Sequence, residues 1–512
     1  MKILFAALHF GYFRNLESVV DELARRGHHV HLTAERQDSA LGGREIVERL
    51  ASSHDTVTFG MSARRERAYF FLASKIRLSL DYLRYLRPEY ARAPALRRRA
   101  RVRTPRGLVS ALRLPLLRAS SGRRLLARLF DAIDHALPPS RAIERFLDEQ
   151  RPDLAVITPL VGVKASSQLD LLRSVRARHI PGAVCVWSWD HLSSKAIIRD
   201  APDRLFVWND IQKREALELH AVPPARVVVT GAQCFDRWFD RQPSRDRAQF
   251  ARDVGLPNDG TFVLWVCSAL FPGSPSEAEF VMRWATHLRA SDNPALRDVR
   301  ILIRPHPSRA GEWDDVDWRT VPGVALWGGN PVDDRSRADY YDSLYYSGAV
   351  VGLNTSAFIE AGIAERPVLA ILPPEFSASQ EGTLHFGYLI DGGLLTISRT
   401  LAEHEAQLAT MLQAPPAAVM RRQQEFIRAF VRPRGLDVSA TRVMADALES
   451  LAADGPVEGP RPAPLVGKIG FAALRAVARV PGARRLLLDE REVKAKKRRA
   501  REEQASGAAG IA

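Results

Sequence analysis

The chain has 512 residues and carries 74 lysines and arginines against 59 aspartates and glutamates, a formal net charge of +15. This length exceeds one ordinary hydrophobic core and predicts two or three domains of about 150 residues each. Hydrophobic residues make up 46% of the chain, which excludes wholesale disorder, and only three cysteines are present, which excludes a disulfide framework. We therefore expect a large globular protein of a reducing compartment, the cytoplasm.

The positive charge is concentrated in two segments. Residues 84–128 hold 14 lysines and arginines and a single acid, and residues 461–502 hold 13 basic residues and four acids. The rest of the chain is mildly acidic. A nucleic-acid-binding domain builds its positive surface into the domain itself, so this distribution argues against a nucleic-acid partner.

The first 240 residues alternate between strand-like and helix-like patterns. An apolar run at 3–8, a helical pattern at 16–26, a glycine and a second apolar run at 29–33 form a βαβ unit, which requires a parallel sheet. Further strands are predicted near 56–59, 154–158, 183–187, 204–208 and 226–230. Residues 63–150 interrupt this alternation with helical patterns rich in arginine, leucine and tyrosine. We assign 1–240 to one Rossmann-like domain with a basic helical insertion.

A second α/β series follows, and we assign residues 241–453 to a second Rossmann-like domain. Its strands are predicted at 261–267, 299–304, 324–327, 349–353 and 368–371, with helical patterns between and after them. Residues 454–512 are interpreted as a Pro/Gly-rich linker and a basic tail. Within the tail, 466–488 alternates apolar residues with arginines at near-helical spacing, a pattern typical of segments that lie on an anionic membrane surface. A solvated basic tail is the alternative, and no apolar run is long enough to span a bilayer.

Open parallel sheets bind ligands beyond the carboxyl ends of their strands, so the residues that follow each strand are the candidates for a site. Arg304 and His306, in the motif RPHP, follow a strand of the second domain. Each proline keeps the preceding residue extended, so the two side chains point the same way and are suited to a phosphate that gains charge. A stiff turn with solvated side chains is the alternative.

Thr355 and Ser356 follow the next-but-one strand and begin a helix, where free N–H groups favour an anion. Plain helix capping is the alternative. Glu360 lies four residues after Ser356, rather than the three of a capping box, so its carboxylate is available to accept the hydroxyls of a ribose.

Two further residues are candidates for binding the nucleotide. Ser268 follows the strand at 261–267 and could contribute backbone N–H groups to a phosphate, although any surface loop can have this composition. Gln380 lies among polar and aromatic residues after the strand at 368–371, and this segment suits either the wall of a cleft or an ordinary connection.

The first domain contributes the candidates for a catalytic base. His9 follows the first strand, and a histidine at this place could take a proton from an acceptor hydroxyl near neutral pH, although a lone histidine is also a common structural residue. Asp190, in WSWDHLSSK after another strand, is a second candidate base; it could instead orient His9 or cap the next helix.

Together these motifs resemble the GT-B glycosyltransferases, whose two Rossmann-like domains face each other across a cleft. The resemblance spans about residues 1–450 and is strongest at RPHP and NTSAFIEAGIAERPVLAI. These match the His-Pro and Ser/Thr-Ser motifs of CDP-glycerol glycerophosphotransferases and of sialyl- and Kdo-type transferases. The resemblance implies that the His-Pro and Ser motifs hold the phosphate of the donor and that Glu360 lies at the position of a ribose-binding acid. The acidic-acidic-Gly motif of several such sialyltransferases is missing, and the insertion is not part of the pattern.

The resemblance implies a glycosyltransferase that moves a sugar from a nucleotide-sugar donor to a surface polysaccharide or glycolipid. It implies no metal and no cofactor, and the basic segments predict attachment to the inner face of the cell membrane. A CDP-glycerol-type polyol-phosphate transferase, a UDP-sugar 2-epimerase and a non-catalytic nucleotide- or lipid-binding scaffold are the alternatives.

Overall fold

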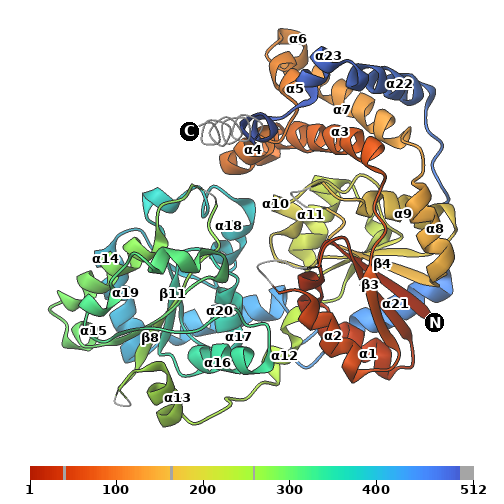
Figure 1. The fold of residues 1–512 in the computed structure, drawn as a ribbon. Coiled ribbons are helices and arrows are strands. Elements are labelled where there is room, and N and C mark those ends of the chain that lie inside the picture. Colours follow the sequence, from red (N-terminus) through yellow and green to blue (C-terminus); the bar gives the residue numbers. More distant parts are fainter. Residues whose placement is uncertain (38–41, 162–164, 258–259, 272, 496–512) are drawn as a thin grey trace, which may run out of the picture.

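The computed structural model describes residues 1–37, 42–161, 165–257, 260–271 and 273–495, and it contains two parallel sheets, one in each half of the chain (Figure 1). The first sheet has the order β3-β2-β1-β4-β5-β6-β7. Its strands are β1 (Lys2–Ala7), β2 (His29–Ala34), β3 (Val57–Met61), β4 (Leu154–Thr158), β5 (Gly182–Cys185), β6 (Arg204–Val207) and β7 (Val227–Val229). All of the pairings are parallel, as the sequence predicts.

The second sheet has the order β10-β9-β8-β11-β12-β13 and is also parallel throughout. Its strands are β8 (Phe262–Val266), β9 (Arg300–Arg304), β10 (Val324–Leu326), β11 (Ala349–Gly352), β12 (Val368–Ile371) and β13 (Thr396–Ser398). Only β13 was not predicted, although the equally short strands β7 and β10 were. The predicted fold class, two Rossmann-like parallel-sheet domains, is confirmed.

Helices cover both faces of each sheet, which is why the strands are apolar runs rather than alternating patterns. The first sheet is covered by α1 (Glu17–Arg25), α2 (Arg44–Ser53), α8 (Arg141–Gln150), α9 (Gln168–Ala177), α10 (His191–Ser194) and α11 (Asp210–His220). The second domain contains α13 (Arg247–Val254), α14 (Glu277–Arg289), α15 (Pro294–Arg297), α16 (Asp334–Tyr345), α17 (Ala357–Ile363), α18 (Leu384–Asp391), α19 (Leu401–Gln413) and α20 (Ala417–Phe430). Each sheet therefore lies between two buried apolar clusters.

The chain crosses between the domains twice, and the two crossings contact each other. Asp236, in α12 (Asp236–Phe239) on the first crossing, forms a salt bridge with Arg432 at 2.9 Å and accepts the backbone N–H of Thr441 at 2.6 Å on the return crossing. Gly231 has φ +92°, and a Cβ there would lie 2.8 Å from the Cβ of Ala440. Only glycine allows this backbone conformation and this close approach.

The return crossing leads into α21 (Ala440–Asp454), which packs against the first domain. Met444 and Leu448 of this helix are fully buried with Val19 and Leu23 of α1. The sequence assigns residues up to 453 to the second domain, whereas the packing assigns 440–454 to the first. A single amphipathic helix carries no information about which of two domains its apolar face will cover, so the sequence alone could not make this distinction.

The insertion and the tail together form one helical module (Figure 1). Its helices are α3 (Arg67–Tyr85), α4 (Pro94–Arg101), α5 (Arg106–Ala111), α6 (Pro115–Arg118), α7 (Ser120–His135), α22 (Leu465–Arg479), α23 (Pro481–Arg484) and the 3₁₀ turn η8 (Arg485–Leu487). Phe471 and Leu474 of the tail pack on Ile76 and Ile133 of the insertion. The tail is therefore docked on the insertion, and within the described residues no helix is both long and apolar enough to cross a bilayer. Residues 496–512 lie outside the described residues.

Candidate active site

Arg304 is the last residue of β9, at the carboxyl edge of the second sheet. Its side chain is buried, and its guanidinium lies over the ring of Tyr340, 5.0 Å from the ring centroid. Nη1 also donates to the backbone oxygen of Asp339 at 3.5 Å. Burial lowers the pKa of Arg304, and Tyr340, Asp339 and Glu360 partly offset this. The structure thus fixes a guanidinium at the strand end where a ligand of such a sheet binds.

Gly328, in the loop after β10, lies directly against this guanidinium. Its φ is +99°, and a Cβ at this position would lie 2.3 Å from the Cζ of Arg304. Any larger residue would therefore displace the arginine. A Cβ on the neighbouring Gly329 would meet no atom within 4 Å, so the close approach is confined to one glycine.

Glu360 lies in α17 and accepts a hydrogen bond from the hydroxyl of Tyr340. Burial raises the pKa of Glu360 to about 7, although Tyr340, Arg14 and Arg304 act in the opposite direction. The carboxyl group is therefore close to half-ionised at neutral pH. Arg304 and Glu360 share Tyr340 as a neighbour, so the structure brings together two of the residues that the sequence singled out.

Arg14 brings a third charge to the same place from the other domain. It lies in the 3₁₀ turn η1 (Phe10–Asn15), which follows β1 of the first sheet. Its charge acts to lower the pKa of Glu360, against the larger effect of burial, and adds to the lowering of the pKa of His306 by burial. Arg14 was not predicted as a site residue. Its position after the first strand was a usable signal, but only the folded arrangement shows that it reaches the second domain.

His306 begins the 3₁₀ turn η5 (Pro307–Trp313). Its Nδ1 accepts the backbone N–H of Ser308 at 3.2 Å, which leaves Nε2 as the protonated nitrogen of a neutral ring. Burial, with smaller contributions from Arg14 and Arg309, lowers the pKa of His306 to about 4. At neutral pH His306 is therefore an uncharged donor.

Thr355 and Ser356 lie at the start of α17, as predicted. The Thr355 hydroxyl accepts the N–H of Ala357 at 3.3 Å, while the Ser356 side chain caps nothing and is exposed. The helix has only seven residues. We therefore attribute the positive field at this edge mainly to Arg304 and Arg14, and we assign α17 the role of carrying Glu360.

Ser268 and Gln380 follow β8 and β12, as predicted, and both form hydrogen bonds to neighbouring loops. The Ser268 N–H donates to Glu277 at 2.7 Å, and its hydroxyl oxygen accepts the N–H of Asn354 at 3.0 Å. The Gln380 Nε2 donates to the carbonyl oxygens of Leu353 and Ile371, at 3.0 and 2.7 Å. Because their donors are already engaged, both residues connect strand-end loops, and direct binding of the nucleotide by them stays a prediction.

His9 and Asp190, the candidate bases, both lie at the carboxyl edge of the first sheet. His9 precedes η1 and packs on Tyr12 with ring centroids 4.3 Å apart. Asp190 accepts hydrogen bonds from Lys195 at 2.6 Å and from Ser194 at 2.7 Å. Burial alone would raise the pKa of Asp190, but Lys195 and the other neighbours outweigh it and hold that pKa well below its usual range. This ion-paired carboxylate is a weak base, so His9 remains the first candidate.

The carboxyl edges of the two sheets face each other. Trp189, which follows β5, packs edge-on against His385 of the second domain with centroids 4.7 Å apart. The Tyr388 hydroxyl donates to Glu215 across the same boundary at 2.9 Å. With Arg14 reaching towards Glu360, these contacts place the base candidates of the first domain opposite the charged cluster of the second.

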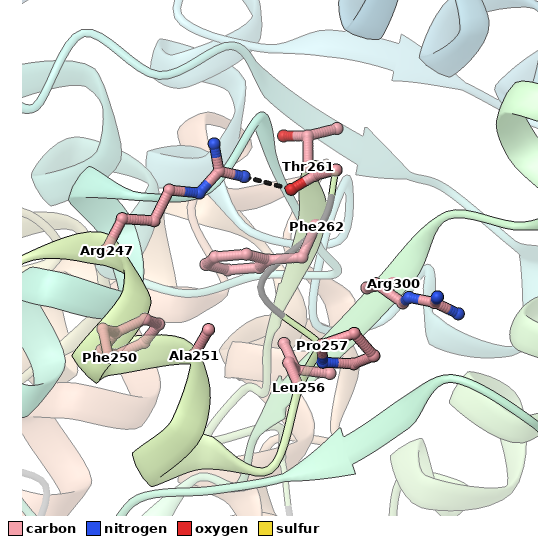
Figure 2. A pocket seen from close by; sticks show the side chains of 9 residues that line it. Arg247, Phe250, Ala251, Leu256, Pro257, Thr261, Phe262 and Arg300 are labelled. Carbon is pink, nitrogen blue, oxygen red and sulfur yellow. Dashed lines mark hydrogen bonds between the residues drawn. The ribbon is translucent and has the colours of Figure 1, made fainter.

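A small pocket lies at the opposite edge of the second sheet (Figure 2). It is lined by Phe250, Leu256, Thr261 and Phe262, and Arg247 closes it with a hydrogen bond to the carbonyl oxygen of Gly260. Arg300, at the amino end of β9, also lines it. Because the pocket lies at the amino ends of β8 and β9, it is separate from the cluster around Arg304.

No protein-family model matches the chain, and no curated protein matches its sequence. Among solved structures, the UDP-GlcNAc 2-epimerase from Neisseria meningitidis bound to UDP-GlcNAc is similar over 88% of this chain and 100% of that chain, with 11% identity and a TM-score of 0.50. A glycosyltransferase from Rickettsia africae is similar over 88% of this chain and 98% of that chain, with 9% identity and a TM-score of 0.49. The UDP-GlcNAc 2-epimerase from Methanocaldococcus jannaschii is similar over 88% of this chain and 100% of that chain, with 10% identity and a TM-score of 0.49.

At these identities the likeness concerns the fold alone. The Neisseria structure aligns with 88% of the chain, which includes both domains. The two sheets described above are both parallel, with a Rossmann-type strand order, and their carboxyl edges face each other. The chain therefore has the two-domain GT-B fold.

Proposed function

We propose that the protein is a glycosyltransferase that moves a sugar from a nucleotide-sugar donor to a polysaccharide or glycolipid of the cell surface. The observation that carries the proposal is the convergence of Arg304, Arg14, His306 and Glu360 between the facing sheet edges. Two guanidinium groups beside a carboxyl group match a diphosphate followed by a ribose. In GT-B folds this is the chemistry of a nucleotide donor.

The proposed mechanism depends on preorganised charge. As the bond between the sugar and the diphosphate breaks, negative charge grows on the departing phosphate, and Arg304 and Arg14 already lie where they can stabilise it. The neutral His306 donates a hydrogen bond from Nε2 to the same group. The guanidinium groups supply the positive charge, so the proposal requires neither a metal ion nor a cofactor.

The acceptor binds against the first domain in this proposal. His9 takes the proton of the acceptor hydroxyl, and closure of the domains excludes water, which would otherwise compete as the acceptor. We place the reaction at the cytoplasmic face of the cell membrane, where both a soluble donor and a lipid-linked acceptor are available.

A screen of nucleotides tests the donor site. We expect one of UDP, CMP, CDP and GDP to raise the melting temperature by several degrees, because a ligand that binds only the native state stabilises it by about 2.7 kcal/mol at 100 times its dissociation constant. The variant Arg304→Ala should lose this shift. If no nucleotide raises the melting temperature of the wild-type protein, the donor site is wrongly assigned.

A UDP-sugar 2-epimerase is the second candidate, because the Neisseria structure that shares this fold is such an enzyme. The two functions differ in their need for an acceptor. An epimerase interconverts its nucleotide sugar when no acceptor is present, whereas a transferase releases the nucleotide only when an acceptor is added. Proton NMR of the nucleotide sugar distinguishes them, and consumption of CDP-glycerol in place of a nucleotide sugar would identify a polyol-phosphate transferase.

Binding of the nucleotide should depend on pH through Glu360. The pKa of this carboxyl group is raised to about 7 in the unliganded protein, and only the ionised form can accept both ribose hydroxyls. Below pH 7 a proton must leave before binding, so the affinity should fall by up to about tenfold per pH unit and should level off above pH 7.

Calorimetric titration between pH 5.5 and 8.5 measures this dependence. The ligand should be a nucleotide sugar, because its diphosphate diester does not titrate in this range. Glu360→Gln should bind more weakly and with a flat pH profile. An unchanged profile in that variant would assign the titration to another group.

A further inference from the structure

The outer surface of the helical module is unusually apolar for a protein exposed to water. Among the described residues, 13 large hydrophobic side chains are exposed, and nine of them belong to this module. The nine are Leu114, Leu116, Leu125, Leu465, Val466, Ile469, Val477, Val480 and Leu486. Such a concentration of exposed apolar side chains marks an interaction surface rather than ordinary scatter.

The tail is held on the insertion by close packing, so the two segments present a joint surface. A Cβ at Gly467 would lie 2.0 Å from the carbonyl oxygen of Ala132, and one at Gly470 would lie 2.7 Å from the side chain of Ile133. The two glycines therefore let α22 lie directly on the backbone of α7. A larger residue at either position would separate the helices.

Ion pairs fix the far end of the tail. Lys75 of α3 is buried and pairs with Asp489 at 3.2 Å and with Glu492 at 2.6 Å. The backbone N–H of Arg106 donates to the carbonyl oxygen of Leu488 at 3.1 Å. Because the tail is anchored at both ends, its outer side chains keep a constant orientation.

The outward side of α22 is divided into an apolar stripe and a basic stripe. At about 100° per residue, the exposed side chains of Leu465, Val466, Ile469 and Val477 fall within an arc of about 120°. Phe471 and Leu474 lie on the opposite, module-facing side. The basic residues lie along one border of the apolar stripe, and they are Lys468, Arg475 and Arg479.

The insertion adds leucines and arginines of the same kind. Leu116 of α6 is 77% exposed and Leu125 of α7 is 68% exposed. The exposed arginines of this part of the module are Arg113, Arg118, Arg124 and Arg128. Sequence ranges 90–130 and 459–488 contain no acidic residue, so the charge on this surface has a single sign. In Figure 1, α6, α22 and α23 lie on the side of the module away from both sheets.

We propose that this surface, formed jointly by the insertion and the tail, docks the protein on an anionic lipid bilayer. Exposed leucines insert at the boundary of headgroups and acyl chains, and the surrounding arginines attract the anionic headgroups. A second copy of the chain is a poorer partner, because a symmetric contact would bring like charges together. The proposal does not depend on the donor site, since it involves none of the residues around Arg304.

Vesicle flotation of the full chain tests the proposal. The wild-type protein should float with vesicles of phosphatidylcholine and phosphatidylglycerol, and binding to phosphatidylcholine alone should be at least about tenfold weaker. The pair Leu116→Ser and Leu125→Ser should reduce binding to the mixed vesicles by about tenfold, and so should Leu465→Ser and Ile469→Ser. Substitutions are preferable to deletion of the tail, which would uncover Ile133.

A matched control replaces exposed apolar residues outside the module. Met61→Ser with Val457→Ser should float as the wild type does, and all variants should keep the wild-type melting temperature because the altered side chains are exposed. Equal flotation of the insertion or tail variants with the wild type would overturn the proposal. So would equal binding to neutral vesicles, or light scattering that shows self-association abolished by the same leucine substitutions.

Discussion

Replacing Arg304 with alanine should lower kcat/KM for the nucleotide-sugar donor by about 10²–10³-fold, equivalent to about 3–4 kcal/mol. The guanidinium is held in place by Tyr340 and by the backbone of Asp339. No free energy is therefore needed to orient this side chain as the transition state forms. Arg304→Lys should recover only part of the activity, because an ammonium group lacks the planar fork that matches a phosphate. Steady-state kinetics with the nucleotide sugar found in the screen gives both values.

Two matched controls separate this role from a general effect on the fold. Arg300 lies at the other end of the same strand, so Arg300→Ala should keep nearly wild-type kinetics. Gly328→Ala should reproduce much of the loss with Arg304 still present, because the added methyl would collide with the guanidinium, whereas Gly329→Ala should not. A change of less than threefold in Arg304→Ala, in a variant that melts normally, would remove this arginine from the mechanism.

Replacing Glu17 with glutamine should lower the free energy of unfolding by about 3 kcal/mol. Glu17 is only 3% exposed and forms salt bridges with Arg49 at 2.9 Å, Arg237 at 3.0 Å and Arg337 at 2.6 Å. These arginines come from the first domain, the first crossing and the second domain. Losing the carboxylate would leave three guanidinium groups close together without their counter-charge.

The effect of Glu17 also has a defined pH dependence. Burial acts to raise the pKa of this carboxyl group, but the three arginines outweigh it and the pKa is lowered. The stabilisation is therefore present above the ordinary pKa of about 4.5 and is lost as the pH falls. Urea denaturation at pH 7 and pH 4 should show that the difference between wild type and Glu17→Gln shrinks in acid. As a control, Glu48→Gln breaks an exposed ion pair on α2 and should lower the free energy of unfolding by at most about 0.5 kcal/mol. An equally small decrease for Glu17→Gln would show that Glu17 does not link the domains.

The two sheets could be predicted because their strands are continuous apolar runs, and helical patterns separate most of them. The residues of the candidate site could be predicted only in part. Arg304, His306 and Glu360 follow strands or begin helices, which are positions that local sequence reveals. Arg14 carries the same kind of signal, yet its partner Glu360 is 346 residues away in the chain. No local pattern encodes how two domains face each other.

Ser268 and Gln380 show the opposite limit. Their polarity suits a binding site, but each side chain is buried and satisfies backbone groups of neighbouring loops. A serine or glutamine that holds a loop and one that holds a ligand have the same local sequence. The tail shows the same limit. Its amphipathic pattern predicts that it contacts a membrane surface, but it does not reveal that helix α7 contributes to the same exposed surface.

The pairing of the two crossings at Asp236 has a consequence for movement during turnover. Both covalent links to the second domain pass through one point, and α21 and the helical module are both attached to the first domain. A rotation about that point would carry Arg304 and Glu360 towards or away from His9. It would also move Phe271 and Leu384 of the second domain across the module, against which they pack. With the module docked on a bilayer as proposed, the second domain would therefore move relative to the membrane, while the first domain and the module would remain bound to the lipid.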